Sequence, residues 1–207
     1  WGRSFEHHID AELGSNEKLQ RDLQPVEVTA DLLHQGLAGA IYYGAMEFGP
    51  RALGARSIIA SPADSSINDS LNKRLSRTEF MPFAPYVMDS DADDVFEIDS
   101  IDAYACRFMT ITVPVKPEWR ERIPGVVHID GTAPPQILSR NPNPLYYDIL
   151  QAFTQRSGLP VLVNTSFNAH EEPIVNTPEQ CLKARLDGRI DFVVTSQAVY
   201  KLRAKNV

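Results

Sequence analysis

The sequence predicts an α/β fold in which helices flank a mixed β-sheet. Segments with helical and strand periodicity alternate along the chain, which is typical of α/β proteins. Several predicted strands follow one another without a helix between them, so parallel and antiparallel pairs are expected in one sheet. No repeat or linker divides the 207 residues, a length that suits one domain, and residues 1–207 are therefore treated as a single domain.

Each expected helix has a start signal followed by apolar residues at helical spacing. The predicted starts are Thr29, Asp64 or Ser65, Asn143-Pro144 and Thr177-Pro178. The first helix ends near Gly36, the second carries Ile67, Leu71 and Leu75, the third stops at Gly158 and the fourth runs to about Leu186. Two of these starts combine a capping residue with proline at the first helical position. Gln180 completes a capping box with Thr177.

The expected strands are short runs of apolar and β-branched residues. In chain order they cover residues 38–43, 57–60, 107–115, 126–129, 161–163, 192–195 and 198–202. Residues 134–144 are rich in proline and asparagine and are expected to form a loop.

Composition and charge exclude several classes of protein. The chain has 20 Lys and Arg against 27 Asp and Glu, a net charge of −7, so its overall field repels nucleic acid. No apolar run approaches the roughly 20 residues of a membrane helix and no signal-peptide pattern is present, so a cytoplasmic protein without a membrane partner is expected. Cys106 and Cys181 lack Cys-x-x-Cys spacing and are expected to be reduced and buried. The first residue is Trp1 rather than Met, which indicates processing or a longer parent chain.

The densest motif is EFGPRALGARS, residues 47–57. Its glycines and proline bend the backbone, and it projects Arg51 and Arg56. The basic residues from Glu47 to Arg77 are Arg51, Arg56, Lys73, Arg74 and Arg77. Three acidic residues oppose them in a chain that is acidic overall. Because guanidinium groups match phosphate and carboxylate geometry, this cluster predicts an anion site, with Arg51–Glu47 ion pairing as the alternative.

Two more motifs directly follow predicted strands, where α/β folds place ligands. Asn164, Ser166 and Asn168 belong to NTSFN and present polar groups suited to phosphate or ribose, although a turn that satisfies its own backbone is an equal alternative. The HIDGT motif supplies His128, Asp130, Gly131 and Thr132. A histidine at a strand end is more often a structural hydrogen-bonding group, so this motif carries less weight.

Other chemistries lack their sequence signatures. His7, His8, His34 and His170 show no metal-ligand spacing, and no metal site is predicted. Neither a P-loop nor a G-x-G-x-x-G motif is present, so any ATP binding is unconventional. No G-x-S-x-G elbow occurs, and the cysteines have no catalytic context.

Four motifs together resemble, in order and spacing, the O-carbamoyltransferase family that includes NodU, NolO and CmcH type proteins. They are EFGPRALGARS, RTEFMPFAP (77–85), HIDGTA and NTSFN-x-x-x-EPIV. The likeness is to the C-terminal YrdC-like domain of that family and extends from about Gly2 to Leu202.

The resemblance implies a twisted mixed sheet whose concave basic face holds ATP, with Mg²⁺, and carbamoyl phosphate. Carbamoyl phosphate would be converted there to carbamoyl adenylate. An actin-like N-terminal domain, outside this sequence, would then transfer the carbamoyl group to a hydroxyl of a small acceptor such as a Nod factor or an antibiotic.

The resemblance also assigns roles. Arg51, Arg56 and Arg77 would clamp phosphate or carbamoyl oxygens, with Lys73 completing the cationic wall. Ser166 and Asn168, with Asn164 nearby, would face nucleotide phosphates or the carbamoyl group. His128, Asp130, Gly131 and Thr132 would line the opposing wall.

The sequence departs from the family pattern at two positions. Pro134 follows Thr132-Ala133 where the family usually has arginine, which removes one charge-assisted contact. Arg140 is the expected substitute. Gly2-Arg3 stands in place of Gly-Pro at the domain entrance. Two alternative functions stay open: a related enzyme that makes threonylcarbamoyl adenylate for tRNA modification, and a non-catalytic nucleotide-binding module.

Overall fold

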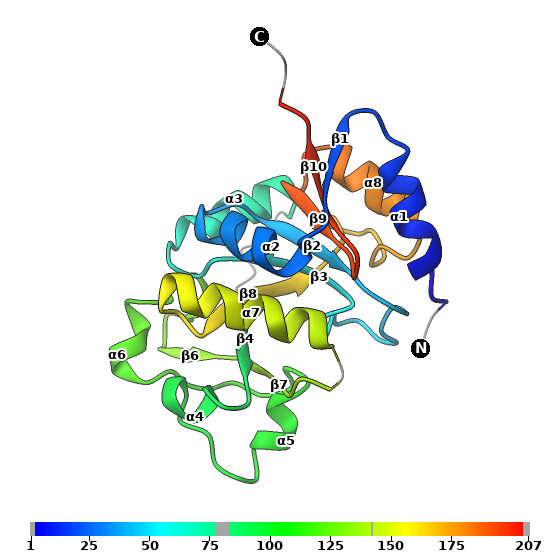
Figure 1. The fold of residues 1–207 in the computed structure, drawn as a ribbon. Coiled ribbons are helices and arrows are strands. Elements are labelled where there is room, and N and C mark those ends of the chain that lie inside the picture. The colour runs from blue at the N-terminus through cyan, green and yellow to red at the C-terminus, as the bar shows by residue number, and fades with distance from the viewer. Residues whose placement is uncertain (1–2, 78–82, 142, 205–207) are drawn as a thin grey trace.

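The computed structural model describes residues 3–77, 83–141 and 143–204. Its main feature is an eight-stranded mixed sheet with strand order β1-β10-β9-β2-β3-β8-β4-β7 (Figure 1). The strands are β1 Leu19–Asp22, β2 Gly39–Tyr42, β3 Arg56–Ala60, β4 Ala84–Met88, β7 Gln136–Leu138, β8 Val161–Ser166, β9 Phe192–Val194 and β10 Val199–Leu202. A separate pair consists of β5 Val113–Pro114 and β6 Thr132–Ala133.

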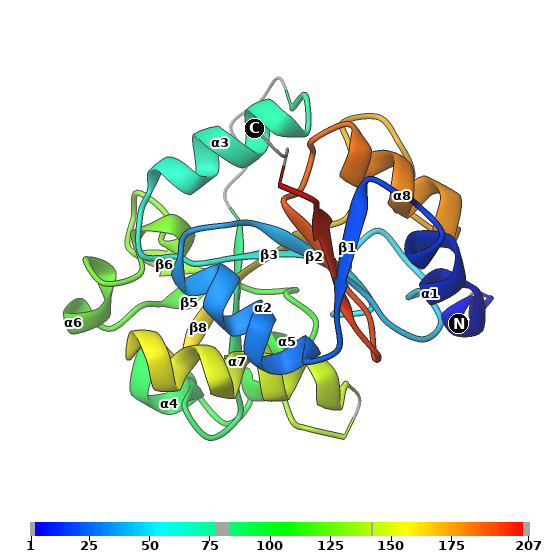
Figure 2. The same ribbon diagram turned by 45° about the horizontal axis from the view of Figure 1, so that its top comes forward.

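Helices surround this sheet (Figures 1 and 2). They are α1 Glu6–Gly14, α2 Pro25–His34, α3 Ser66–Arg74, α4 Ala92–Val95, α5 Ala103–Cys106, α6 Pro117–Arg120, α7 Pro144–Ser157 and α8 Pro178–Leu186, with a 3₁₀ turn η1 Pro124–Val126. α2 and α7 pack side by side over one face, and α1 and α8 pack together near β1 and β9. All residues of β2, β3 and β4 are buried, as expected for strands covered on both faces. The predicted mixed α/β class is confirmed.

Helices with strong capping signals match the sequence analysis. Asn143 Oδ1 accepts from the N–H of Tyr146 at 3.0 Å, and α7 ends at Gly158 with φ +70°. Thr177 and Gln180 form the predicted capping box of α8. The predicted helix after Ser65 is α3. Local capping chemistry thus accounts for where α7 and α8 start.

Several predicted boundaries are wrong. The helix expected to start at Thr29 starts at Pro25, and Thr29 is a buried residue inside it. Proline at the first helical position is the start signal there. The strand expected at 107–115 contains only Val113–Pro114, because Met109 has φ +53°, which an extended strand cannot adopt.

Other strands were misplaced or missed. Residues 126–129 form no strand, because Pro124 starts η1 and a turn follows it. β7 interrupts the loop predicted at 134–144. Neither β1 nor β4 was predicted, and α1 was missed as well. β4 is a continuous buried run without alternation, a pattern that does not separate a strand from other buried segments.

Candidate functional site

Three segments of the chain meet where β8 ends. β8 is antiparallel to both of its neighbours, with Ser166 opposite Ser57 of β3 and Asn164 opposite Ala84 of β4. The loop that precedes β3 and the segment that precedes β4 therefore lie beside the last residues of β8. Polar groups carried by these three segments can contact one ligand.

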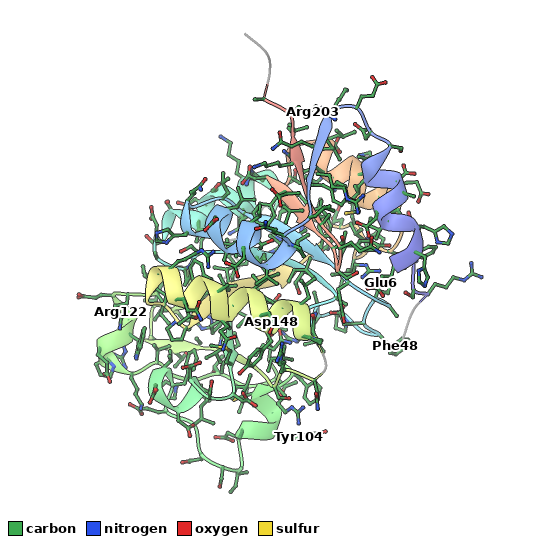
Figure 3. All side chains as sticks on the ribbon, viewed as in Figure 1. Glu6, Phe48, Tyr104, Arg122, Asp148 and Arg203 are labelled. Atoms are coloured by element: carbon green, nitrogen blue, oxygen red, sulfur yellow. The ribbon has the colours of Figure 1, made fainter. Side chains whose placement is uncertain are left out.

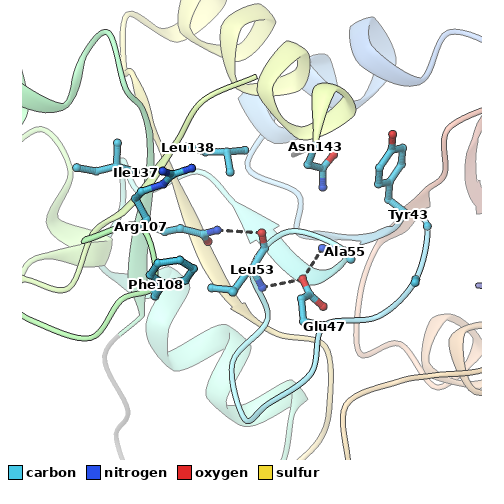
Figure 4. A pocket seen from close by; sticks show the side chains of 12 residues that line it. Tyr43, Glu47, Leu53, Ala55, Arg107, Phe108, Ile137, Leu138 and Asn143 are labelled. Carbon is cyan, nitrogen blue, oxygen red and sulfur yellow. Dashed lines mark hydrogen bonds between the residues drawn. The ribbon is translucent and has the colours of Figure 1, made fainter. Parts of the chain in front are cut away.

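The loop before β3 is shaped by buried bonds. Glu47 is 6% exposed, and its Oε1 accepts from the N–H groups of Leu53 at 2.7 Å and Ala55 at 2.6 Å (Figure 4). Gly54 has φ +119°, and a Cβ at this position would lie 2.9 Å from the ring of Tyr146. Only glycine meets both demands. The backbone of this loop is therefore fixed by its own sequence.

Arg56 differs from its predicted role. It is 0% exposed, and its Nη atoms donate to the carbonyls of Tyr43 at 2.9 Å, Ala55 at 2.8 Å and Gly44 at 3.1 Å. Its guanidinium carbon lies 3.6 Å from the centroid of the Tyr42 ring. Burial lowers the pKa of Arg56 and raises that of Tyr42 to about 12. A guanidinium used in this way holds the loop and does not face a ligand.

A hollow of about 280 Å³ lies at the end of β8. Its polar lining residues are Arg51, Arg77, Asn164, Thr165, Ser166, Asn168, His170 and Glu171. Its other lining residues are Pro50, Ala52, Phe83, Ala84, Met109 and Pro134. We call it the β8 hollow. It brings together Arg51, Arg77 and the NTSFN motif, as the sequence analysis expected.

Two arginines face this hollow from different segments. Both Nη atoms of Arg77 lie 3.2 Å from Thr165 Oγ1, and its guanidinium carbon is 5.5 Å from the Phe83 ring centroid. Burial lowers the pKa of Arg77, but a guanidinium remains charged in proteins. Arg51 is exposed and has no carboxylate within 4 Å among the described residues. The alternative Arg51–Glu47 ion pair is not seen, since Glu47 Oε1 bonds to backbone N–H groups.

The Ser-x-Asn pair is internally ordered. Ser166 Oγ donates to Asn168 Oδ1 at 2.5 Å. Asn168 Nδ2 donates to the carbonyls of Glu172 at 2.8 Å and Ala169 at 3.1 Å. This agrees in part with the alternative of a self-satisfied turn. The arrangement fixes the Ser166 hydroxyl in place, and Ser166 is among the residues that line the β8 hollow.

Asn164 forms the buried side of the hollow, with 1% of its surface exposed. Its Nδ2 donates to Gln136 Oε1 at 2.6 Å and to the Ala52 carbonyl at 3.2 Å. Gln136, also 1% exposed, donates through Nε2 to the Leu53 carbonyl at 2.9 Å (Figure 4). This chain of amides ties the loop of Arg51 to β7 and β8.

The HIDGT residues are placed elsewhere. His128 and Asp130 line a second hollow, of about 790 Å³, which shares no described lining residue with the β8 hollow. Asp130 Oδ1 accepts from the Thr132 hydroxyl at 2.7 Å, which lowers the pKa of Asp130, and Thr132 Oγ1 lies 3.4 Å from His128 Nδ1. Gly131 is buried with φ +82°. These groups hold their own turn and do not form the wall opposite Arg51.

Two further basic residues also lie outside the β8 hollow. Lys73 is exposed on α3 and does not line it. Arg140 pairs with Asp148 at 3.0 Å and is 64% exposed, so it does not replace the arginine expected at position 134. Pro134 itself does line the hollow. Most of the RTEFMPFAP motif, residues 78–82, lies outside the described residues.

Sequence analysis did not single out His170, Glu171 or Met109 as lining residues. His170 and Glu171 follow NTSFN directly, and this proximity was the available signal. Glu171 has φ +61°, in the left-handed region that is costly for a non-glycine residue. Its neighbour Glu172 pairs with Arg189, which lowers the pKa of Glu172, so the two adjacent carboxylates have different surroundings.

A mostly apolar hollow of about 400 Å³ is lined by other residues of the same loop (Figure 4). Leu53, Phe108 and Leu138 are among its walls, with Glu47 and Asn143 at its edge. Phe48, at the outer edge of the molecule, is 95% exposed (Figure 3). The loop that carries Arg51 therefore contributes residues to a polar hollow and to an apolar one.

Within the described ranges, no group of three or more His, Cys, Asp or Glu side chains could hold a metal ion. No helix there is long and apolar enough to cross a membrane. Cys106 and Cys181 are free and buried as predicted, and burial raises the pKa of Cys181 to about 12.

Two arginines and a Ser-x-Asn turn in one hollow of a mixed α/β domain are residue types that suit a small oxyanion. The chain belongs to the family described as Carbamoyltransferase C-terminus, whose model matches residues 30–201. It is 35% identical over 210 residues to nodulation protein NolNO of Sinorhizobium fredii, covering 98% of this chain and 31% of that protein. An uncharacterised Methanocaldococcus jannaschii protein is 40% identical over 166 residues, covering 80% of this chain and 27% of the relative.

The chain thus spans about a third or less of the length of these relatives. Its fold is similar to a crystal structure of full-length HypF in a phosphate- and nucleotide-bound form. The TM-score is 0.61 at 19% identity, covering 86% of this chain and 22% of HypF. This likeness concerns the fold alone and agrees with the mixed α/β class expected from the sequence.

Proposed function

We propose that this chain is a single C-terminal domain of a longer O-carbamoyltransferase. In this domain, water cleaves carbamoyl phosphate to carbamate and phosphate, and the carbamate attacks the α-phosphate of ATP to give carbamoyl adenylate and release pyrophosphate. The observation that carries the proposal is the meeting of Arg51 and Arg77 with Ser166 in the β8 hollow. Membership of the carbamoyltransferase family and the phosphate- and nucleotide-bound HypF neighbour support it. The acceptor hydroxyl and the actin-like partner domain would belong to the rest of the parent chain.

The size of the hollow supports a small anion. Its volume of about 280 Å³ is at the low end of the ~300–1,000 Å³ usual for ligand sites. Carbamoyl phosphate or the phosphates of a nucleotide suit this space, and adenosine would extend beyond it. Arginine contacts lower the repulsion between two anionic reactants, which is the main demand of this reaction.

Mg²⁺ would bind chiefly to the nucleotide phosphates. Of the described residues that line the hollow, Glu171 carries the carboxylate. A nucleotide-bound Mg²⁺ needs only one or two protein carboxylates, so this residue fits as a ligand. The ion would neutralise phosphate charge, while Arg51 and Arg77 orient the phosphate oxygens.

Thermal unfolding with carbamoyl phosphate or ATP tests the proposal, because a ligand that binds the folded state raises the melting temperature. Arg51→Ala and Ser166→Ala should remove that rise, whereas Arg140→Ala, which deletes an equal charge outside the hollow, should keep it. Pyrophosphate exchange that depends on carbamoyl phosphate then tests turnover. Normal ligand stabilisation in both hollow variants would show that the site lies elsewhere.

One observation favours a second function, nucleotide binding without turnover. Pro134 places an apolar ring on the wall where the family usually carries arginine. Tight ATP binding without pyrophosphate exchange would support this reading, and a Pro134→Arg variant that gains exchange would attribute the difference to this position.

A further inference from the structure

The amide of Asn164 has a fixed orientation. Gln136 Nε2 donates to the Leu53 carbonyl, so Gln136 Oε1 must be the acceptor for Asn164. The second neighbour of the Asn164 amide nitrogen, the Ala52 carbonyl, is also an acceptor. Both contacts require N–H donors, which assigns Nδ2 to this side and Oδ1 to the other.

Oδ1 of Asn164 is thereby left as an acceptor without a donor. No described residue donates to it, although the side chain is 1% exposed and lines the β8 hollow. A buried acceptor without a partner is costly and is usually satisfied by a ligand or an ordered water. The hollow thus combines positive charge at the arginines with an unpaired acceptor at the end of β8.

We propose that Asn164 Oδ1 accepts a hydrogen bond from the amino group of the carbamoyl moiety and makes Asn164 a specificity-determining residue. The inference rests on the proposed function. In carbamoyl phosphate, oxygens accept hydrogen bonds and the NH₂ group alone donates. Arg51 and Arg77 suit the oxygens, and Asn164 Oδ1 suits the NH₂ group. Acetyl phosphate, which carries a methyl group instead, would leave Oδ1 unpaired.

Met109 packs against the same amide on its nitrogen side. Its Sδ lies 3.7 Å from Asn164 Nδ2, and it lines the same hollow. Sulfur is a weak acceptor, so this third contact also suits an N–H donor and agrees with the assignment of Nδ2 to that side.

The test compares the affinities of carbamoyl phosphate and acetyl phosphate by titration calorimetry on the folded chain. We expect carbamoyl phosphate to bind about tenfold more tightly, the usual effect of one unpaired buried acceptor. Asn164→Ala should reduce this ratio to about one by weakening carbamoyl phosphate binding. Arg51→Ala should weaken both ligands and keep the ratio. Gln136→Met removes one of the two acceptors that fix the Asn164 amide, while the Ala52 carbonyl still requires Nδ2 on its side. This variant should therefore lower stability and keep the ratio.

The outcomes separate the inference from the proposed function. Equal affinity of the wild-type chain for the two phosphates, or an unchanged ratio in Asn164→Ala, would overturn the role of Asn164 alone. Binding of neither phosphate would overturn the proposed function and the inference with it. Should Asn164→Ala fail to fold, phosphonoacetamide and acetonylphosphonate decide the question on the wild-type chain. This stable pair also differs only by NH₂ against CH₃, and the inference requires the amide to bind more tightly.

Discussion

Arg51 and Arg56 lie five residues apart in one motif, yet the structure predicts opposite results when each is replaced. Arg56→Met removes the donors to the Tyr43 and Gly44 carbonyls and the stacking on Tyr42. The carbonyl of Ala55 keeps a second donor, the N–H of Tyr43. Two unpaired carbonyls and the lost stacking, at about 1 kcal/mol each, give a destabilisation of about 3 kcal/mol.

For a chain of this size the loss corresponds to a fall of roughly 6–12 °C in melting temperature. Arg51→Ala removes an exposed side chain and should leave the melting temperature within about 1 °C of wild type. Differential scanning calorimetry measures both variants. In phosphate titrations the order reverses, since Arg51→Ala loses the ligand contact directly. A stable Arg56→Met, or a destabilised Arg51→Ala, would refute the assignment of the two arginines.

Two further predictions concern other parts of the fold. Gly54→Ala should destabilise the protein by about 2 kcal/mol or more, because alanine at φ +119° is strained and its Cβ would contact the Tyr146 ring. Urea unfolding measures this change, and an unchanged unfolding midpoint would contradict the geometry. Arg189 lowers the pKa of Glu172 in the folded protein. The pair therefore stabilises the folded state at pH values above the ordinary Glu pKa of about 4.3. This stabilisation is lost as the pH falls through the lower pKa that Glu172 has in the folded state. Glu172→Gln should therefore melt below wild type at neutral pH and converge with it in acid, and a gap that stays constant with pH would exclude this pair as its cause.

Local signals account for much of the fold. Asn143 and Thr177 capped helices where the sequence indicated, because capping depends on residues within one turn. The error at 107–115 has a different origin. Alternating side chains predicted a strand, but Met109 adopts a positive φ as it packs against Asn164 in a distant strand. Tertiary packing decided that segment, and single-sequence periodicity carries no information on it.

In the candidate site, too, the sequence motifs predicted some features and tertiary packing decided others. The motifs indicated that Arg51, Arg77 and Ser166 share one ligand, and the β8 hollow contains all three. They did not indicate that Arg56 is buried, because residue type and spacing give no side-chain direction in an irregular loop. His128 was grouped with the site from its position after an expected strand. That strand is absent, and the grouping fails with it.

The β8 hollow draws its walls from residues near positions 51, 77, 109, 134 and 166. No short stretch of the polypeptide holds enough of it to bind alone, so the binding surface comes into existence only when strand pairings far apart in the chain are complete. A binding measurement on this hollow would therefore detect only molecules whose sheet is fully formed. Truncated or partly folded molecules should show no ligand binding even when much of their secondary structure has formed.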